Sequence, residues 1–152
     1  MSRFVLSEMG KPVAGVAPVD IGGVAKTSDY WSMENYSHVS IIVYCGAITN
    51  SSTIILYESD DADGNNKTAI AFSYYQITAG VTGDRTANEA TGLVTGTTNG
   101  SMFVIEVDAD DLSPGYPFMT MITDTAGANV ITIIPILSGA RYAQAVPPTA
   151  LA

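Results

Sequence analysis

Residues 36–58, YSHVSIIVYCGAITNSSTIILYE, decide the fold class of this chain. Two runs dense in β-branched and aromatic residues flank a short polar turn containing Gly46, Asn50 and Ser51, a pattern that predicts an antiparallel hairpin. Alternation makes one face of the first run wholly apolar, formed by Val39, Ile41, Val43 and Cys45. Such a face needs a partner sheet, so the stretch predicts a two-layered β-protein.

Further runs with strand character follow along the chain. They cover residues 68–77, 102–107, 118–123 and 130–137, and the last two are expected to form a second hairpin across the turn TDTAGAN. Residues 78–100 are rich in Gly, Thr and Asn, and one or two short strands are expected there, around residues 93–97, because long structureless loops are uncommon. The chain therefore predicts an all-β fold, an antiparallel β-sandwich with jelly-roll-like topology.

The length of 152 residues fits one domain with loose ends. We expect an extended N-terminal arm over residues 1–28, a sandwich domain over residues 29–139 and a C-terminal tail over residues 140–152. The arm is rich in Gly and Pro but also apolar, so it must dock. Two places fit it equally well: a neighbouring subunit, or the edge of its own sheet.

The composition is poor in charge, which indicates a surface covered by Ser, Thr, Asn and Gly, or area buried against neighbouring molecules, or both. Hydrophobic residues make up 47% of the chain, whereas charged residues make up only 14%, against roughly 25% in an ordinary soluble protein. The net charge of −9 comes from fifteen acids and six scattered bases. Nucleic acid and anionic membranes are therefore not expected as partners, because both are bound by clustered bases.

The single cysteine, Cys45, cannot form an internal disulfide and lies among aliphatic residues, so it is interpreted as a buried, unreactive side chain. The first 15 residues lack the apolar core of a signal peptide, and no run approaches the ~20 apolar residues of a membrane span. We therefore expect the protein to be made and folded in a cytoplasm.

The segment DYWSMENY, residues 29–36, carries the aromatic residues Tyr30, Trp31 and Tyr36. Aromatic side chains grouped in this way form either a stacking platform for sugar rings or the core at one end of a β-sandwich. The core interpretation is favoured. A carbohydrate-binding module remains the alternative from a different functional class.

Two acidic segments resemble metal sites only in part. In residues 58–67, ESDDADGNNK, the residues Asp61, Asp63 and Gly64 match positions of a calcium loop. The match then fails, because Ser59 and Ile70 occupy positions that require ligands. An Asp-rich turn is expected instead, in which Gly64 and Asn65 adopt the left-handed conformation. Residues 108–116, DADDLSPGY, predict a helical turn capped by Asp108 and anchored by Leu112. Neither segment is expected to bind a metal.

The residues of common active sites are missing. His38 is the sole histidine, so neither a serine triad with a spare base nor a His-rich metal site can be assembled, and His38 is interpreted as a packing or turn residue. No nucleotide-binding, nucleophile-elbow or paired-cysteine motif occurs. We expect no enzyme activity, no catalytic residues, no cofactor and no metal.

The run VITIIPIL, residues 130–137, is apolar on both faces and contains Pro135. Because proline cannot donate a ladder hydrogen bond, this strand is expected at an edge or a bend. Its second apolar face is expected to contact another subunit or the arm.

Several stretches together resemble a known class of proteins. These are APVDIGG, DYWSMENYSHVSIIVYCGA, TIILYESDDADGNNKTAIAF, FVIEVDADDLSPGY and ARYAQAVPP. From about Ala17 onward the chain resembles small structural proteins encoded in the head-gene regions of tailed bacteriophages, and most of all the jelly-roll head decoration, or cement, proteins.

The resemblance implies a virion protein on the capsid exterior, assembled in the bacterial host cytoplasm. It implies binding to the major capsid protein as a homo-oligomer, often a trimer, which staples neighbouring subunits together. It supplies no catalytic residues. Another virion component, such as a tail-tube or head-completion protein, remains an alternative.

Overall fold

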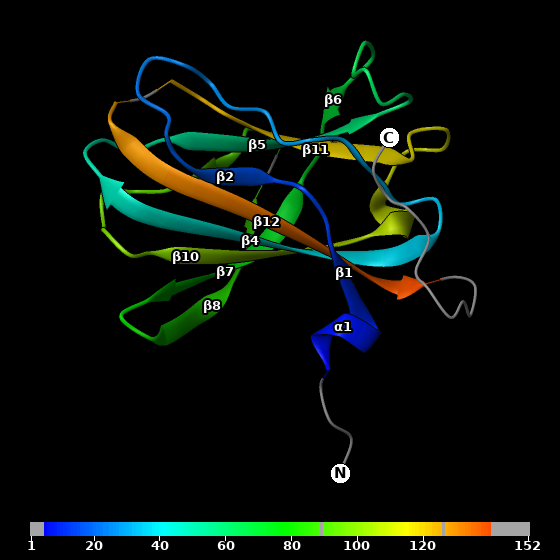
Figure 1. Ribbon diagram of the computed structural model, residues 1–152, viewed down its shortest axis with the longest axis horizontal. Helices are drawn as coiled ribbons and strands as arrows, with labels where there is room; N and C mark the ends of the chain where they lie inside the picture. Colours follow the sequence, from blue (N-terminus) through cyan, green and yellow to red (C-terminus); the bar gives the residue numbers. More distant parts are fainter. Residues whose placement is uncertain (1–4, 89, 126, 141–152) are drawn as a thin grey trace.

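The computed structural model describes residues 5–88, 90–125 and 127–140, and it is an all-β protein. Two antiparallel sheets pack face to face (Figure 1). Within the described residues the only helical elements are α1 (Leu6–Met9) and the 3₁₀ turn η1 (Ala109–Asp111). None of the described helices is long and apolar enough to cross a membrane. The predicted antiparallel β-sandwich is confirmed.

Each sheet is defined here by its described strands. The large sheet has the order β1-β12-β4-β10-β7-β8, with β2 also paired to β12, and the small sheet has the order β3-β11-β5-β6, with β9 also paired to β5. The large sheet contains β1 (Gly10–Pro12), β2 (Val16–Asp20), β4 (Tyr36–Ile48), β7 (Phe72–Thr78), β8 (Val81–Asn88), β10 (Met102–Asp108) and β12 (Asn129–Ala140). The small sheet contains β3 (Trp31–Ser32), β5 (Thr53–Ser59), β6 (Thr68–Ala69), β9 (Leu93–Val94) and β11 (Phe118–Thr123).

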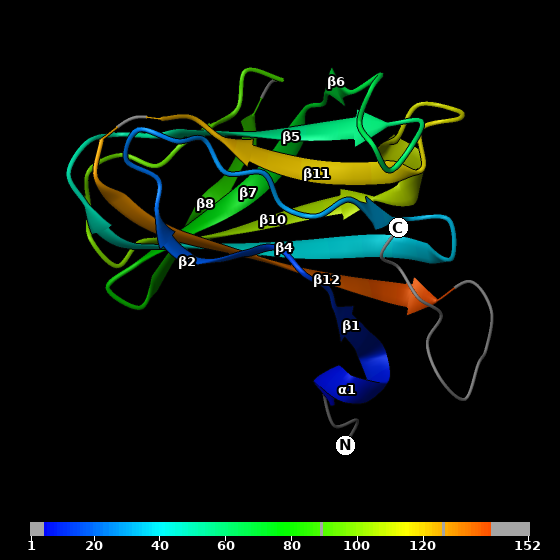
Figure 2. The same cartoon turned by 45° about the horizontal axis from the view of Figure 1, so that its top comes forward.

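The strand pairing gives the topology of a jelly roll. Strands β2, β3, β4 and β5 pair antiparallel with β12, β11, β10 and β6 respectively, so early strands pair with late ones in nested order. This is one long hairpin folded over on itself, and the β12·β4 and β11·β5 pairs then complete the two sheets. The β7–β8 hairpin extends the large sheet beyond that plan (Figure 2).

The two hairpins expected from the sequence are wrong. β4 belongs to the large sheet and the following β5 to the small sheet, and the same holds for β12 and the preceding β11. Each polar connection crosses between the sheets, so the two runs face each other across the core instead of pairing edge to edge. This arrangement covers both apolar faces, which a flat hairpin would leave exposed on one side.

The buried side chain of Asn129 joins the two crossings. Its Oδ1 accepts hydrogen bonds from the backbone N–H groups of Thr49 (2.7 Å) and Asn50 (3.1 Å). Its Nδ2 donates to the carbonyl of Asn50 at 2.6 Å and to the Ser52 hydroxyl. Because buried polar groups require partners, this residue fixes the corner between β4 and β5 against the start of β12.

The core lies between the sheets and follows the predicted alternation. The inward face of β4 is fully buried, as expected, and β10 contributes Phe103, Ile105 and Val107 to the same core. Across it, Ile54, Leu56, Met119 and Met121 are fully buried on the small sheet. The sandwich is therefore held by apolar packing between its layers.

Residues 68–100 differ from the expectation in two ways. The expected strand over residues 68–77 is split at residues 70–71, where the chain leaves β6 in the small sheet and enters β7 in the large one. β9 confirms the short strand expected near residue 93. The sequence missed β8, whose residues are almost all exposed and show no apolar alternation.

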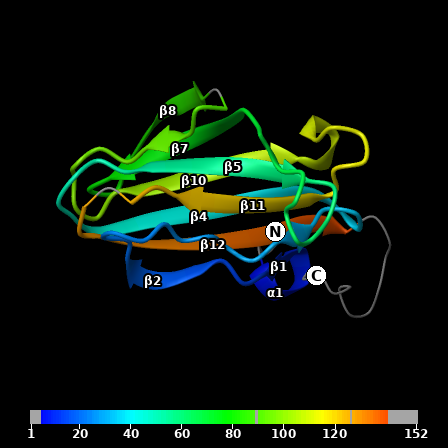
Figure 3. The same cartoon turned by 90° about the horizontal axis from the view of Figure 1, so that it is seen from above.

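The arm runs along the margin of its own sheet. β1 pairs with residues 136–138 of β12, and β2 pairs with residues 130–133 (Figure 3). Val13, Val16 and Ile21 are buried in the core. Of the two docking places expected for the arm, β1 and β2 therefore occupy the edge of the chain's own sheet. Residues 1–4 and the tail from residue 141 lie outside the described residues.

Pro135 led us to expect β12 at an edge or a bend. β12 is not an edge strand, because β4 lies on one side of it and β1 and β2 on the other. The backbone N–H of Val13 donates to the carbonyl of Pro135 at 3.0 Å. The N–H and C=O groups of one residue in an antiparallel strand point to the same side. The side of Pro135 that lacks an N–H therefore also faces the arm. It falls where the arm changes from β1 to β2, and the ladder with β4 is unaffected.

Candidate functional site

The large sheet has a second face, directed away from the small sheet, and in the described part of the chain only α1 lies over it (Figures 1 and 2). Apolar side chains point outward from four neighbouring strands and form what we call the outer apolar face. Its members are Val130, Ile134 and Ile136 on β12, Ile42 and Tyr44 on β4, Met102 and Val104 on β10, and Tyr75 and Ile77 on β7.

The strand register makes this face continuous. Ile134 lies opposite Ile42, Ile42 opposite Val104, and Val104 opposite Tyr75, which gives one apolar row across four strands. Several of these side chains remain accessible, with Tyr44 42% and Ile134 41% exposed. Contiguous apolar surface of this kind marks an interaction site in soluble proteins.

A groove separates α1 from this face. It has a volume of about 340 Å³ and is lined on the helix side by Leu6 and Met9 and on the sheet side chiefly by Ile42, Val104 and Ile136. Leu6 is 38% and Met9 53% exposed, so the two apolar side chains of α1 are incompletely covered. Ser40, Glu106 and Ser138 give the groove one polar margin.

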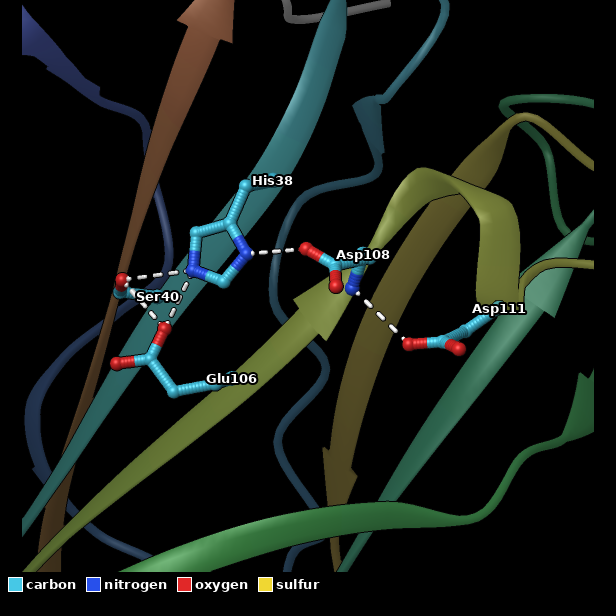
Figure 4. Close-up of polar contacts among 5 residues, drawn as sticks. All are labelled: His38, Ser40, Glu106, Asp108 and Asp111. Atoms are coloured by element: carbon cyan, nitrogen blue, oxygen red, sulfur yellow. Dashed lines mark hydrogen bonds and ion pairs between the residues drawn. The ribbon is translucent and has the colours of Figure 1, made fainter.

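That polar margin continues into a cluster around His38 (Figure 4). The Nε2 atom of His38 lies 2.5 Å from Glu106 Oε2, and its Nδ1 lies 2.7 Å from Asp108 Oδ1. The Ser40 hydroxyl donates to the same Glu106 oxygen at 2.7 Å. The pairing of β4 with β10 brings these residues together, because Ser40 lies opposite Glu106 and His38 opposite Asp108.

Charge within the cluster favours protonated His38. Partial burial by itself lowers the pKa of His38, but hydrogen bonds and negative charge from Asp108 and Glu106 outweigh it, so the pKa is raised above its ordinary value of 6.5. Two carboxylates surround one imidazolium, so the cluster keeps a net negative charge. Both ring nitrogens are engaged, which leaves neither free to act as a base on a substrate.

The predicted helical turn follows the cluster directly. Asp111 accepts a hydrogen bond from the backbone N–H of Asp108 at 3.1 Å, and Leu112 packs against the core as expected. In the loop over residues 58–67, Asp61 accepts from the N–H of Gly64 at 2.6 Å, and Gly64 has a positive φ. Asn65 does not adopt the expected left-handed conformation. No described group of His, Cys, Asp or Glu is arranged to hold a metal ion.

The aromatic segment forms core and not a binding platform. Trp31 is fully buried and Tyr36 is 2% exposed. Tyr30 is half-buried, and its pKa is raised by that burial and by the charge of Asp61. A sugar-binding surface built on Trp31 and Tyr36 is therefore wrong, because rings that stack on sugars must face solvent. Cys45 is buried as expected, and desolvation raises its pKa to about 11.

A second, more polar depression lies beside β7, β8 and β10. It has a volume of about 500 Å³ and is lined by Arg85, Glu106, Asp111 and Asn88, among others. The buried Nδ2 of Asn88 has no hydrogen-bond partner among the described residues. The depression shares Glu106 with the groove beside α1. The Glu106 carboxylate therefore lies between the depression and the groove.

Sequence reasoning found part of this surface. It indicated a second apolar face on residues 130–137, but it did not identify the His38 cluster or the groove. The partners of His38 lie 68 and 70 residues away along the chain, and only the β4–β10 register brings them together. The one available signal was the spacing of Glu106 and Asp108, which puts both on the same side of a strand as Met102 and Val104.

No protein-family model matches the chain, and no curated protein matches it. Among solved structures, the chain is similar to SPBc2 prophage-derived protein YomS. The two share 12% sequence identity and superpose with a TM-score of 0.47, over 85% of this chain and 94% of that chain.

Proposed function

We propose that this chain is a structural virion protein of a tailed bacteriophage. In this proposal it binds the outer surface of the capsid as a homo-oligomer and stabilises the shell. The observation that carries the proposal is the outer apolar face, a continuous apolar surface that the described chain leaves largely uncovered.

The composition supports a protein that works inside an assembly. With only 14% charged residues, the chain devotes little of its surface to charge. Its net charge of −9 speaks against nucleic acid or an anionic membrane as the covering partner. Protein surface is the remaining partner, supplied by further copies and by the major capsid protein.

The stabilising role follows from mass action. A protein that binds only the assembled shell lowers the free energy of that shell relative to its separated subunits. An oligomer gains further because several weak contacts made together act as one tight attachment. No cofactor, metal or catalytic residue is needed for this role.

The carbohydrate-binding alternative loses its structural basis, because Trp31 and Tyr36 are buried. Another virion role, in the tail tube or in head completion, keeps the same requirement for partner surface. Electron micrographs of the purified protein distinguish it, since rings or tubes indicate such a role.

The proposal is tested by co-sedimentation with empty shells assembled from the major capsid protein encoded in the same genome. We expect saturable binding and a higher melting temperature of the decorated shells. Serum albumin at equal concentration controls for trapping. An absence of binding to both expanded and unexpanded shells contradicts the proposal.

A further inference from the structure

The outer apolar face carries a protrusion beside a recess. α1 stands off the sheet at one margin, and the groove of about 340 Å³ lies between it and Ile42 and Val104. In a contact between identical copies related by a two-fold axis, each surface must complement itself. A protrusion next to a recess meets that condition, because each copy can place its protrusion in the recess of the other.

The size of the face suits such a contact. Seven residues of β12 and four strand widths span roughly 20 Å by 20 Å, or about 400 Å². A standard stable interface buries about 800 Å² on each partner. The face therefore supplies about half of a standard contact, and α1 with the residues preceding it is available to supply more.

Charge indicates which segment fits the groove. The groove margin carries Glu106, and Asp108 lies beside it. His38 is paired with both carboxylates, and Arg85 lines the neighbouring depression that shares Glu106. The chain begins MSRFV, so Arg3 and Phe4 directly precede the described residues. The N-terminal segment thus offers a base to an acidic margin and an aromatic side chain to an apolar groove.

We propose that the outer apolar face is the contact between copies of this chain, and that the N-terminal segment of a second copy, residues 1–9, occupies the groove. Phe4 packs on Ile42 and Val104, and Arg3 faces Glu106. This proposal extends the proposed function and depends on it in one respect only, that the protein must form an oligomer. The acidic groove margin then selects the copy's own N-terminus over other apolar segments.

A charge exchange tests the proposal. Arg3→Glu and Glu106→Lys are made separately, and the association of each is followed by sedimentation velocity over a range of concentrations. An exposed ion pair contributes about 0.2–1 kcal/mol and each two-fold contact contains two of them, so each variant is expected to associate about two- to thirtyfold more weakly than wild type. An equimolar mixture of the two is expected to recover near wild-type association, because opposite charges then meet in both contacts.

Two further variants separate contact from folding. Ile134→Asp places a charge in the middle of the face and is expected to dissociate the oligomer. Val94→Asp, at a 60% exposed valine on the small sheet, is the matched control and is expected to associate normally. Thermal unfolding of all variants checks that each remains folded.

Three results overturn the proposal: a wild-type chain that stays monomeric, association that Ile134→Asp leaves unchanged, or a mixture that fails to recover. The last would show that Arg3 and Glu106 do not pair between copies. Shell co-sedimentation separates the two proposals. A wild-type chain that is monomeric yet binds shells refutes this contact and keeps capsid binding, whereas a wild-type oligomer that binds no shell keeps the contact and refutes capsid binding.

Discussion

His38 is the residue whose environment differs most from its sequence interpretation. A histidine at the start of a strand was expected to pack or turn, yet it is held between Asp108 and Glu106. The interpretation failed because strand register decides the neighbours of a polar residue, and register is a tertiary property. Cys45 and Trp31 were predicted correctly, because alternation and aromatic clustering are local signals of burial.

The first prediction at this scale concerns pH. Because the pKa of His38 is higher in the folded state than its ordinary value of 6.5, protonated His38 stabilises the fold. Its contribution is complete below about pH 6.5 and is lost as the pH rises through the folded pKa. Urea midpoints measured between pH 5.5 and pH 8.5 are expected to fall with increasing pH in this window.

His38→Gln is the control, since His38 is the sole histidine of the chain. The variant is expected to show a flatter dependence of the urea midpoint on pH. NMR titration of the imidazole gives the pKa directly. A measured pKa at or below 6.5 would refute the described ion-paired geometry.

Cys45 gives a second prediction at the residue scale. Burial raises the pKa of its thiol to about 11, so it holds almost no thiolate at neutral pH and is shielded from reagents. Labelling with Ellman's reagent at pH 8 is expected to be negligible in native buffer and complete in denaturant. Rapid labelling of the native protein would contradict the burial of the Cys45 side chain.

At the scale of elements, the strands were easier to predict than their partners. β4, β5, β10, β11 and β12 follow alternating apolar runs, so their positions were found. Their assignment to sheets was not, because a short polar connection fits both a hairpin turn and a crossing between sheets. β8 was missed because an exposed strand at the margin of a sheet needs no apolar face.

The arm gives a prediction at this scale. A Cβ added at Gly15 would overlap the carbonyl oxygen of Ile133 and come within 2.8 Å of Pro135 Cδ, so it would push the arm away from β12. Gly15→Ala is expected to destabilise the fold by about 1–3 kcal/mol. Guanidinium unfolding monitored by Trp31 fluorescence measures the change.

Gly46→Ala is the matched control. A Cβ at Gly46 would meet its nearest neighbours at 3.5 Å, an ordinary contact distance. The substitution is expected to change the unfolding free energy by less than about 1 kcal/mol. Equal effects of the two substitutions would argue against the close approach of the arm to β12.

At the scale of the whole molecule, the arm has two parts with different roles. Val13, Val16 and Ile21 of the arm belong to the core, so a deletion of residues 1–22 removes part of the sandwich itself. We expect this deletion to cost on the order of 5 kcal/mol, because it removes three buried side chains and uncovers one side of β12.

Removal of residues 1–9 alone is expected to change the melting temperature little, since neither Leu6 nor Met9 is buried in the core. It is expected to weaken association, because α1 and the preceding residues then no longer reach a second copy. Comparison of the two deletions by calorimetry and sedimentation separates these roles. Normal association of the shorter deletion would remove the N-terminal segment from the contact.

The central claim is that the outer apolar face is covered by partner surface. Its most direct test is the mass of the purified protein in solution. Light scattering after size-exclusion chromatography is measured at a loading concentration well above micromolar. The account predicts a discrete oligomer whose mass falls on dilution and with Ile134→Asp. A monomer at every concentration, with Tyr44 and Ile134 open to solvent, would contradict it.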